Sequence, residues 1–177
     1  VLDYFNEIDS CNIDSLSDVI SKYTSEDFSM KCTHPFNELG SIDLVANNLW
    51  KPIKDSFSPI QRRLDIFYAG INSLDKNKGK WISSMGHFMG VFNKPFVGLK
   101  PNNKSILLRF AEFYKVENNK ITEGAIFLDV MNLMQQLGLS IIPESTGLVC
   151  VTPGPMNHKG LKFDISNESE SQKTLDL

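Results

Sequence analysis

Asp129 is the carboxylate of this sequence whose position best suits proton transfer. It ends the apolar segment A-I-F-L-D, and strand alternation would place it on the same face as Glu123, Ala125 and Phe127. If that face lines a mainly apolar cavity, burial favours the protonated carboxyl and brings its pKa toward the range that acid/base catalysis uses. The alternative is that Asp129 only caps a helix that begins at Val130.

His87 is the second candidate for chemistry. On a strand it shares a face with Ser83, Met85 and Met89. An imidazole among these side chains can hydrogen-bond a carbonyl oxygen or stabilise the negative charge of an enolate. Buried histidines often have a purely structural role, so both interpretations of His87 stay open.

Arg109 is expected on the strand face that also carries Leu107 and Phe113. A guanidinium in an apolar wall is costly unless it is paired. Arg109 therefore either anchors an anionic or carbonyl group of a ligand, or forms an internal ion pair with Asp65 or Glu123.

Several side chains could hold a flat, apolar ligand, although aromatic and Met side chains are also ordinary core residues. His34 precedes a proline in a predicted turn, which lies either on the plain surface or at the mouth of a pocket. We predict the substrate-binding set to be His34, Trp50, Tyr68, Trp81, Met85, Met89, Arg109 and Phe127.

Motifs of other chemistries do not occur in the sequence. It has no G-x-S-x-G, no Walker loop, no H-E-x-x-H and no strand-linked G-x-G-x-x-G. Its three His and three Cys are widely separated, without a C-x-x-C pair, so neither a metal site nor a disulfide framework is indicated. We expect a pocket that works without a metal or cofactor and uses one carboxylate.

Helical patterns come first in the chain and strand patterns follow. Apolar residues recur at helical spacing at 14–23 and from about 41 to 57, and a short alternating segment lies between them at 28–32. Four long alternating segments follow, which predict strands at 61–71, 80–92, 104–116 and 121–128. A last helix is predicted at 129–137.

Short polar turns, D-K-N-K-G and E-N-N-K, join the first and last pairs of these strands, so consecutive strands should pair antiparallel. The order of elements predicts an α+β fold in which helices pack on one face of a curved antiparallel sheet around a central pocket. We assign residues 1–140 to this domain. Residues 141–177 are predicted to form an irregular extension whose last residues are solvated or act as a linker.

The charges and the apolar segments limit the partners that we expect. The 177 residues carry a formal net charge of −3, from 18 basic and 21 acidic side chains scattered along the chain. We therefore expect no nucleic acid as a partner, and no membrane, since the apolar runs are too short to cross a bilayer. A cytoplasmic protein is predicted, and the apolar outer face of its long strands predicts a homodimer.

The order of motifs resembles that of a known family. G-H-F-M-G at 86–90 is followed by Gly98, Pro101 and Lys104, then by V-E-N-N-K-I-T-E and by an Asp that opens a helix ending Q-Q-L-G. Over about residues 12–139 this order is similar to that of the SnoaL-like polyketide cyclases of the NTF2-like superfamily. The chain departs from the family where it has K-P-N-N-K at 100–104, and where Ala125 takes the place of a common aromatic residue.

The resemblance implies an NTF2-like cone in which Asp129 is the acid or base and His87 lies in the pocket, although a fold alone fixes no reaction. We thus expect a cofactor-independent cyclase, isomerase or related lyase that acts on a polyketide-like or other apolar carbonyl compound, by an intramolecular aldol or ester cyclase type of reaction. Asp129 would move the proton, while His87, with or without Arg109, stabilises the oxyanion. The alternative is a non-catalytic ligand-binding or assembly domain of the same fold.

Overall fold

The structure is a computed structural model of the chain, and it describes residues 1–74 and 79–139 together with single positions in the C-terminal part. These single positions are 143, 147, 154, 155, 160, 161, 163, 169, 172, 173 and 176. Most of the predicted extension and part of the D-K-N-K-G turn therefore lie outside the described residues.

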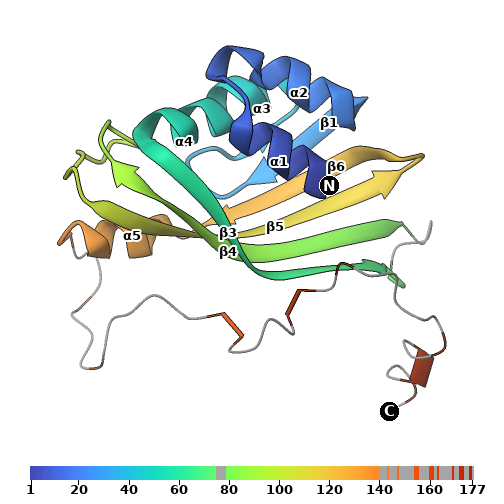
Figure 1. Ribbon diagram of the computed structural model, residues 1–177. Helices are drawn as coiled ribbons and strands as arrows, with labels where there is room; N and C mark the ends of the chain where they lie inside the picture. Colours follow the sequence, from blue (N-terminus) through green and yellow to red (C-terminus); the bar gives the residue numbers. More distant parts are fainter. Residues whose placement is uncertain are drawn as a thin grey trace.

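Six strands form one curved, mixed sheet (Figure 1). Their order across the sheet is β2-β1-β6-β5-β4-β3. The four strands from β3 to β6 pair antiparallel in succession, as the hairpin turns predicted, whereas β1 pairs parallel with β6. The bounds are β1 (Thr24–Cys32), β2 (Glu38–Leu39), β3 (Phe57–Ile71), β4 (Lys80–Phe92), β5 (Ser105–Glu117) and β6 (Lys120–Leu128).

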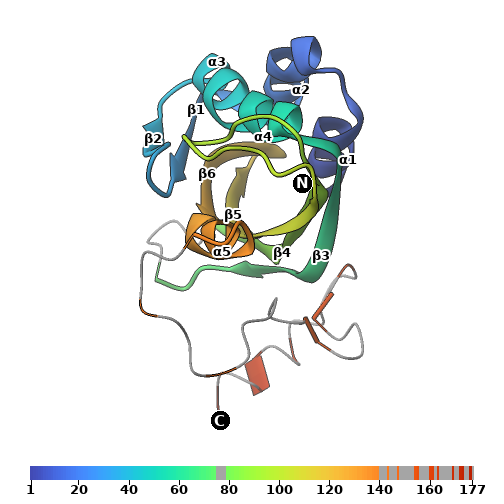
Figure 2. The same ribbon diagram turned by 90° about the vertical axis from the view of Figure 1, so that its left-hand side faces the viewer.

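Helices cover one face of this sheet, as Figures 1 and 2 show for α1 to α4, while α5 lies on the opposite side against β5. Among the described residues, no helix is both long and apolar enough to span a bilayer. The bounds are α1 (Leu2–Ser10), η1 (Ile13–Ser15), α2 (Leu16–Tyr23), α3 (Ile42–Val45), the π-helical turn η2 (Ala46–Trp50), α4 (Lys51–Ser56) and α5 (Val130–Gln136).

The boundaries depart from the sequence prediction in several places. Helix α1 was not predicted, although Tyr4, Phe5 and Ile8 form a buried helical stripe. The strand β1 begins at Thr24, before the start of the alternating segment predicted at 28–32. The strand β3 begins at Phe57 and includes Pro59, which a strand at the edge of the sheet tolerates.

The core lies between the helices and the sheet. Along β5, alternate side chains from Ile106 to Tyr114 are buried there, and the ring of Phe110 packs on that of Phe88 with centroids 4.4 Å apart. Trp50 brings η2 onto the same cluster through an edge contact with Phe88. Aromatic pairs of this kind add about 0.5–1.5 kcal/mol each beyond the area that they bury.

At the level of this cluster the expected central pocket is filled by side chains. The guanidinium of Arg62 lies 4.2–5.3 Å from the centroids of four aromatic rings. Its Nη1 is 2.5 Å from Oε2 of Glu112, and its Nε is 2.9 Å from Oδ2 of Asp9 on α1. The four rings belong to Phe5, Trp50, Phe88 and Phe110.

Candidate functional site

Most of the predicted site residues share one face of the sheet, and it is the outer face, opposite α1 to α4. The inward positions flanking His87 and Arg109 are Gly86, Phe88, Leu108 and Phe110, all buried. Strand alternation therefore directs the predicted residues away from the concave side on which a cavity was expected. The members of this outer-face set are Tyr68, Trp81, Met85, His87, Met89, Arg109, Phe127 and Asp129.

Two predicted binding residues lie elsewhere. Trp50 is a core residue, 1% exposed, and its Nε1 donates to the hydroxyl of Tyr4 at 3.2 Å. Its place among the rings around Arg62 makes its role that of packing. His34 is exposed in the turn after β1. Among the described residues, no side-chain hydrogen bond or ion pair joins either residue to the outer-face set.

His87 and Arg109 are direct neighbours on β4 and β5, and Asp129 continues the same row. The register pairs His87 with Arg109, and the backbone N–H of Asp129 donates to the carbonyl of Arg109 at 3.0 Å. Cross-strand neighbours have Cβ atoms about 5 Å apart, so these side chains can act on one bound molecule.

Asp129 caps a helix, which was the structural alternative predicted for it, and it is also the partner in the ion pair predicted for Arg109. Its Oδ1 accepts from the backbone N–H of Asn132 at 2.9 Å and caps α5, while its Oδ2 accepts from Nη2 of Arg109 at 2.6 Å. The sequence had suggested Asp65 or Glu123 for this ion pair. In the structure Asp65 pairs with His87, and Glu123 pairs with Lys115 at 3.2 Å.

His87 is held by a carboxylate. Its Nδ1 lies 3.0 Å from Oδ2 of Asp65, and only 9% of the His87 side chain is exposed. Its Nε2 is buried and has no hydrogen-bond partner among the described residues. A buried imidazole nitrogen without a partner is a candidate to exchange a proton with a bound molecule.

Helix α5 frames one side of this row through Gln136, the second Gln of Q-Q-L-G. The side-chain Oε1 of Gln136 accepts from the backbone N–H of Leu107 at 3.0 Å, and its Nε2 donates to the carbonyl of Leu107 at 2.8 Å. The amide thus takes the place of a neighbouring strand beyond the end of β6. Asp129 caps the first turn of the same helix, so both ends of α5 are fixed to the outer face.

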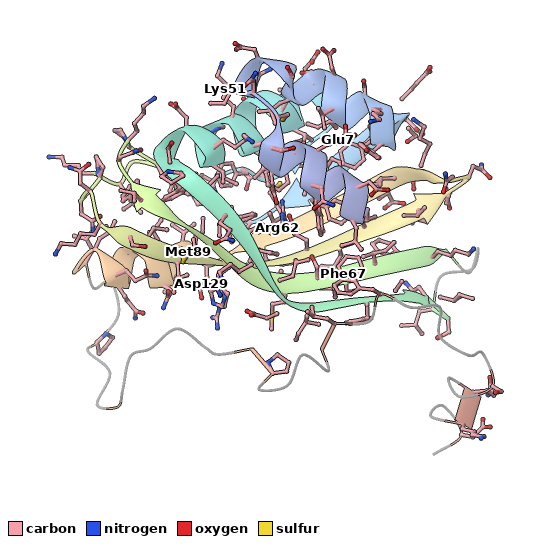
Figure 3. The ribbon with its side chains drawn as sticks, viewed as in Figure 1. Glu7, Lys51, Arg62, Phe67, Met89 and Asp129 are labelled. Atoms are coloured by element: carbon pink, nitrogen blue, oxygen red, sulfur yellow. The ribbon has the colours of Figure 1, made fainter. Side chains whose placement is uncertain are left out.

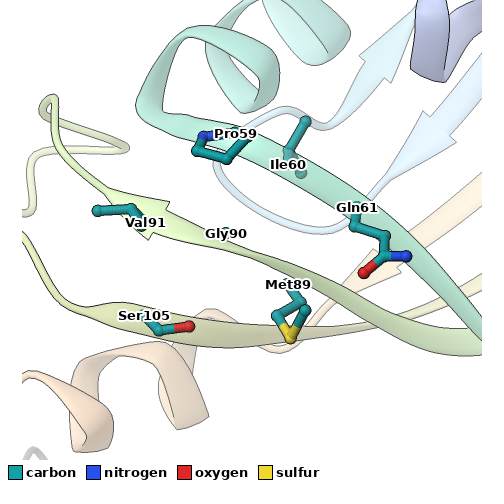
Figure 4. Close-up of a pocket in the computed structure, with 7 residues that line it drawn as sticks. All are labelled: Pro59, Ile60, Gln61, Met89, Gly90, Val91 and Ser105. Atoms are coloured by element: carbon teal, nitrogen blue, oxygen red, sulfur yellow. The ribbon is translucent and has the colours of Figure 1, made fainter.

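A hollow of about 210 Å³ adjoins the row on the side of Met89 (Figure 4). Met89, which lines the hollow, is two residues from His87 on the same face of β4. The hollow therefore begins about 7 Å along the strand from His87. Its lining is mostly apolar, with two polar side chains. The lining residues are Pro59, Ile60, Gln61, Met89, Gly90, Val91 and Ser105.

The sequence analysis missed the buried charges of Arg62 and Glu112, which lie in the cone interior, the space between the sheet and helices α1 to α4. Figure 3 places Arg62 between the sheet and α1, on the side away from Asp129. Burial raises the pKa of the Glu112 carboxyl, although the charge of Arg62 acts in the opposite direction. The signal was present, because Glu112 alternates with Phe110 and Tyr114 on the apolar side of β5. Among the described residues, no three His, Cys, Asp or Glu side chains are grouped to hold a metal ion.

Comparisons with known proteins agree with this fold. A family model described as SnoaL-like polyketide cyclase matches residues 76–137, which include His87, Arg109 and Asp129. No curated protein matches the chain in sequence.

Three solved structures illustrate the likeness. AclR, a candidate hydroxylase from Streptomyces galilaeus, is 16% identical with a TM-score of 0.57, over 81% of this chain and 83% of that chain. An NTF2-like protein from Burkholderia thailandensis is 15% identical with a TM-score of 0.56, over 77% and 92%. IdmH, a candidate polyketide cyclase from Streptomyces antibioticus, is 11% identical with a TM-score of 0.56, over 78% and 98%. The chain thus has an NTF2-like fold and, over residues 76–137, is similar to the SnoaL-like polyketide cyclases.

Proposed function

We propose that the protein is a cofactor-independent enzyme of the cyclase or isomerase type, which acts on a polyketide-like or other apolar carbonyl compound at the outer face of the sheet. The observation that carries this proposal is the buried Nε2 of His87, which has no partner among the described residues and lies beside Arg109. The family likeness over residues 76–137 supports the same class of reaction.

We assign the proton transfer to His87 in place of Asp129. Both carboxyl oxygens of Asp129 already accept hydrogen bonds, from Arg109 and from the backbone of Asn132. The Nε2 atom of His87 would take a proton from the carbon next to a carbonyl group and later return one. Aldol cyclisation and isomerisation both begin with this step.

Arg109 would stabilise the enolate oxygen that forms when the proton leaves. Its guanidinium lies on the strand next to His87, and the ion pair with Asp129 fixes its direction. A fixed cation beside developing negative charge is worth more than a mobile one, because no reorganisation is needed during the reaction. The hollow at Met89 would receive an apolar part of the same molecule.

Deuterium exchange at the acidic carbon of an apolar β-keto thioester tests this proposal without knowledge of the natural substrate. The wild-type protein should accelerate the exchange in D2O, measured by mass spectrometry, and His87→Asn should lower the rate about 10²- to 10⁴-fold. Lys94→Ala, in an exposed ion pair with Asp55, serves as a control that keeps the rate. Unchanged exchange in His87→Asn contradicts the assignment of the base.

A second candidate function is a non-catalytic ligand-binding or assembly domain. The observation that favours it is the cone interior, where Arg62, Glu112 and four aromatic rings occupy the expected pocket. A raised melting temperature with apolar ketones or aromatic esters, without exchange or product, would support this alternative over the enzyme.

A further inference from the structure

The imidazole of His87 is fixed on one side by an acidic residue that the sequence did not assign to it. Nδ1 of His87 and Oδ2 of Asp65 are 3.0 Å apart, and 26% of the Asp65 side chain is exposed. A carboxylate only accepts hydrogen bonds, so Nδ1 carries the proton that it donates. In the neutral imidazole, Nε2 then holds the free electron pair.

Asp65 occupies a β-bulge beside His87. The register of β3 and β4 shifts between the pairs Leu64 with Gly86 and Ile66 with Met85, so Asp65 is the extra residue of β3. Alternation from Arg63, the register partner of His87, already places Asp65 on the face of His87, and the bulge shifts the position of its side chain along β4.

Gly86, the residue before His87, makes room for this bulge. A Cβ atom at Gly86 would lie 1.9 Å from the carbonyl oxygen of Arg63 and 3.2 Å from Cα of Leu64. Backbone atoms cannot move aside as the end of a flexible side chain can, so any side chain at position 86 would displace β3. The first glycine of G-H-F-M-G thus allows the backbone of β3 to approach β4 closely at the bulge.

Two glycines of the C-terminal part pack on the other side of Asp65. A Cβ atom at Gly154 would lie 2.6 Å from Cβ of Asp65, and one at Gly160 would lie 2.9 Å from the Asp65 carbonyl oxygen. The carbonyl of Gly160 also accepts from the backbone N–H of Phe67 on β3 at 2.8 Å. Asp65 therefore lies between His87 and the backbone of Gly154, and the contact with Gly154 limits the rotamers of its side chain.

We propose that Asp65 is a positioning residue that fixes the orientation and tautomer of His87, and that the bulge permitted by Gly86 aims its carboxylate. Its effect on turnover rests on the proposed function, because only then does Nε2 of His87 move a proton. Its effect on the imidazole itself does not depend on any reaction.

Nitrogen NMR of the ¹⁵N-histidine-labelled full chain tests the positioning directly. At a pH where the ring is neutral, we expect wild-type His87 to carry its proton on Nδ1, and Asp65→Ala to return it largely to the Nε2-protonated form that free imidazole prefers. Asp55→Asn, which removes the carboxylate of an exposed ion pair, should leave the His87 signals unchanged. A wild-type ring protonated on Nε2 overturns the proposal, and this measurement needs no variant to fold.

A pair of glycine variants separates the bulge from general effects on the sheet. Gly86→Ala should alter the tautomer signals of His87, because the new Cβ meets the Arg63 carbonyl. Gly70→Ala, in the same pair of strands, should not, since nothing lies within 4 Å of a Cβ there. Unchanged His87 signals in folded Gly86→Ala protein overturn the role given to the bulge.

The deuterium exchange assay distinguishes this inference from the proposed function. Asp65→Ala should lower the exchange rate at least ~10-fold, because the imidazole loses the carboxylate that holds its tautomer and orientation. Exchange that depends on His87 but is unchanged in Asp65→Ala overturns the positioning role alone. A tautomer change in Asp65→Ala without exchange in any variant supports positioning and contradicts the enzyme.

Discussion

The carboxylate of Asp129 joins α5 to the guanidinium of Arg109. Its Oδ2 lies 2.6 Å from Nη2 of Arg109, and its Oδ1 lies 2.9 Å from the backbone nitrogen of Asn132. One side chain thus caps a helix and orients a cation on the neighbouring strand. The start of α5 and the direction of the guanidinium are therefore fixed together.

Two substitutions of Asp129 should separate its functions. Asn caps a helix about as well as Asp, so Asp129→Asn should change the free energy of unfolding by less than about 1 kcal/mol. It removes the charge that holds Arg109, so the exchange rate should fall at least ~10-fold. Asp129→Ala also loses the cap and should cost about 1 kcal/mol more in urea unfolding. Full exchange activity in Asp129→Asn contradicts the role that we give to the Arg109 ion pair.

Breaking the buried ion pair of Arg62 and Glu112 should lower the free energy of unfolding far more than breaking an exposed ion pair. Arg62→Met leaves the Glu112 carboxylate without its cation, and we expect a loss of about 3–5 kcal/mol in urea unfolding. Adding Glu112→Gln removes the charge and keeps one oxygen acceptor for Ser84 or Tyr114, so most of the loss should be recovered. Lys94→Met, in an exposed pair, should cost less than about 1 kcal/mol. A double variant no more stable than Arg62→Met argues against charge as the cause.

The contact between α1 and α2 should weaken in acid. Hydrogen bonds from Lys22 and Tyr23 hold the pKa of Glu7 below its ordinary value. A lowered pKa in the folded state stabilises the protein above the unfolded value, about 4.3, and this contribution disappears as the pH falls through the lowered value. Unfolding free energies from pH 7 to pH 2 should therefore show a smaller acid-dependent loss in Glu7→Gln. Identical pH profiles of the two proteins would mean that the ion pair is not formed in solution.

Cys32 should react slowly with thiol reagents, as expected for a thiol that takes no part in catalysis. Burial raises the pKa of its thiol to about 12. At pH 8 the thiolate fraction is then roughly 10³-fold smaller than for an ordinary thiol of pKa about 8.5. In a Cys11→Ser, Cys150→Ser background, folded protein should label at least ~10²-fold more slowly than the same protein in urea. Equal rates would show that Cys32 is accessible and ionised.

The grouping of the site could be predicted from sequence, but its side of the sheet could not. Strand alternation correctly placed His87 with Met85 and Met89, and Asp129 with Phe127. Which face of a sheet the helices cover depends on contacts between distant segments, and alternation alone is the same for both faces. The buried rings of Phe88 and Phe110 on the opposite face decide it.

The partner of His87 could not be predicted from the sequence either. A β-bulge adds one residue to a strand and breaks the alternation on which pairing arguments depend. Up to the bulge, alternation still places Asp65 on the outer face, so the sequence offered Asp65 as a partner for Arg109 but did not show that it meets His87. The close approach of Gly86 to Arg63, which makes the bulge possible, is a property of two strands that lie more than twenty residues apart in the chain.

The homodimer through the outer face stays a prediction, and Phe127 provides its sharpest test. Its side chain is 53% exposed on β6 and packs edge-on against Phe113 with ring centroids 6.1 Å apart. In a two-fold symmetric interface each copy would bury one such ring, and burying an aromatic side chain is worth about 1.5–3 kcal/mol. Phe127→Ser should therefore weaken dimerisation by about 10²- to 10⁴-fold in Kd, measured by light scattering and analytical ultracentrifugation. Leu74→Ser, at a position 92% exposed in the turn after β3, should leave the mass unchanged. A monomeric wild-type protein at micromolar concentration would contradict the dimer.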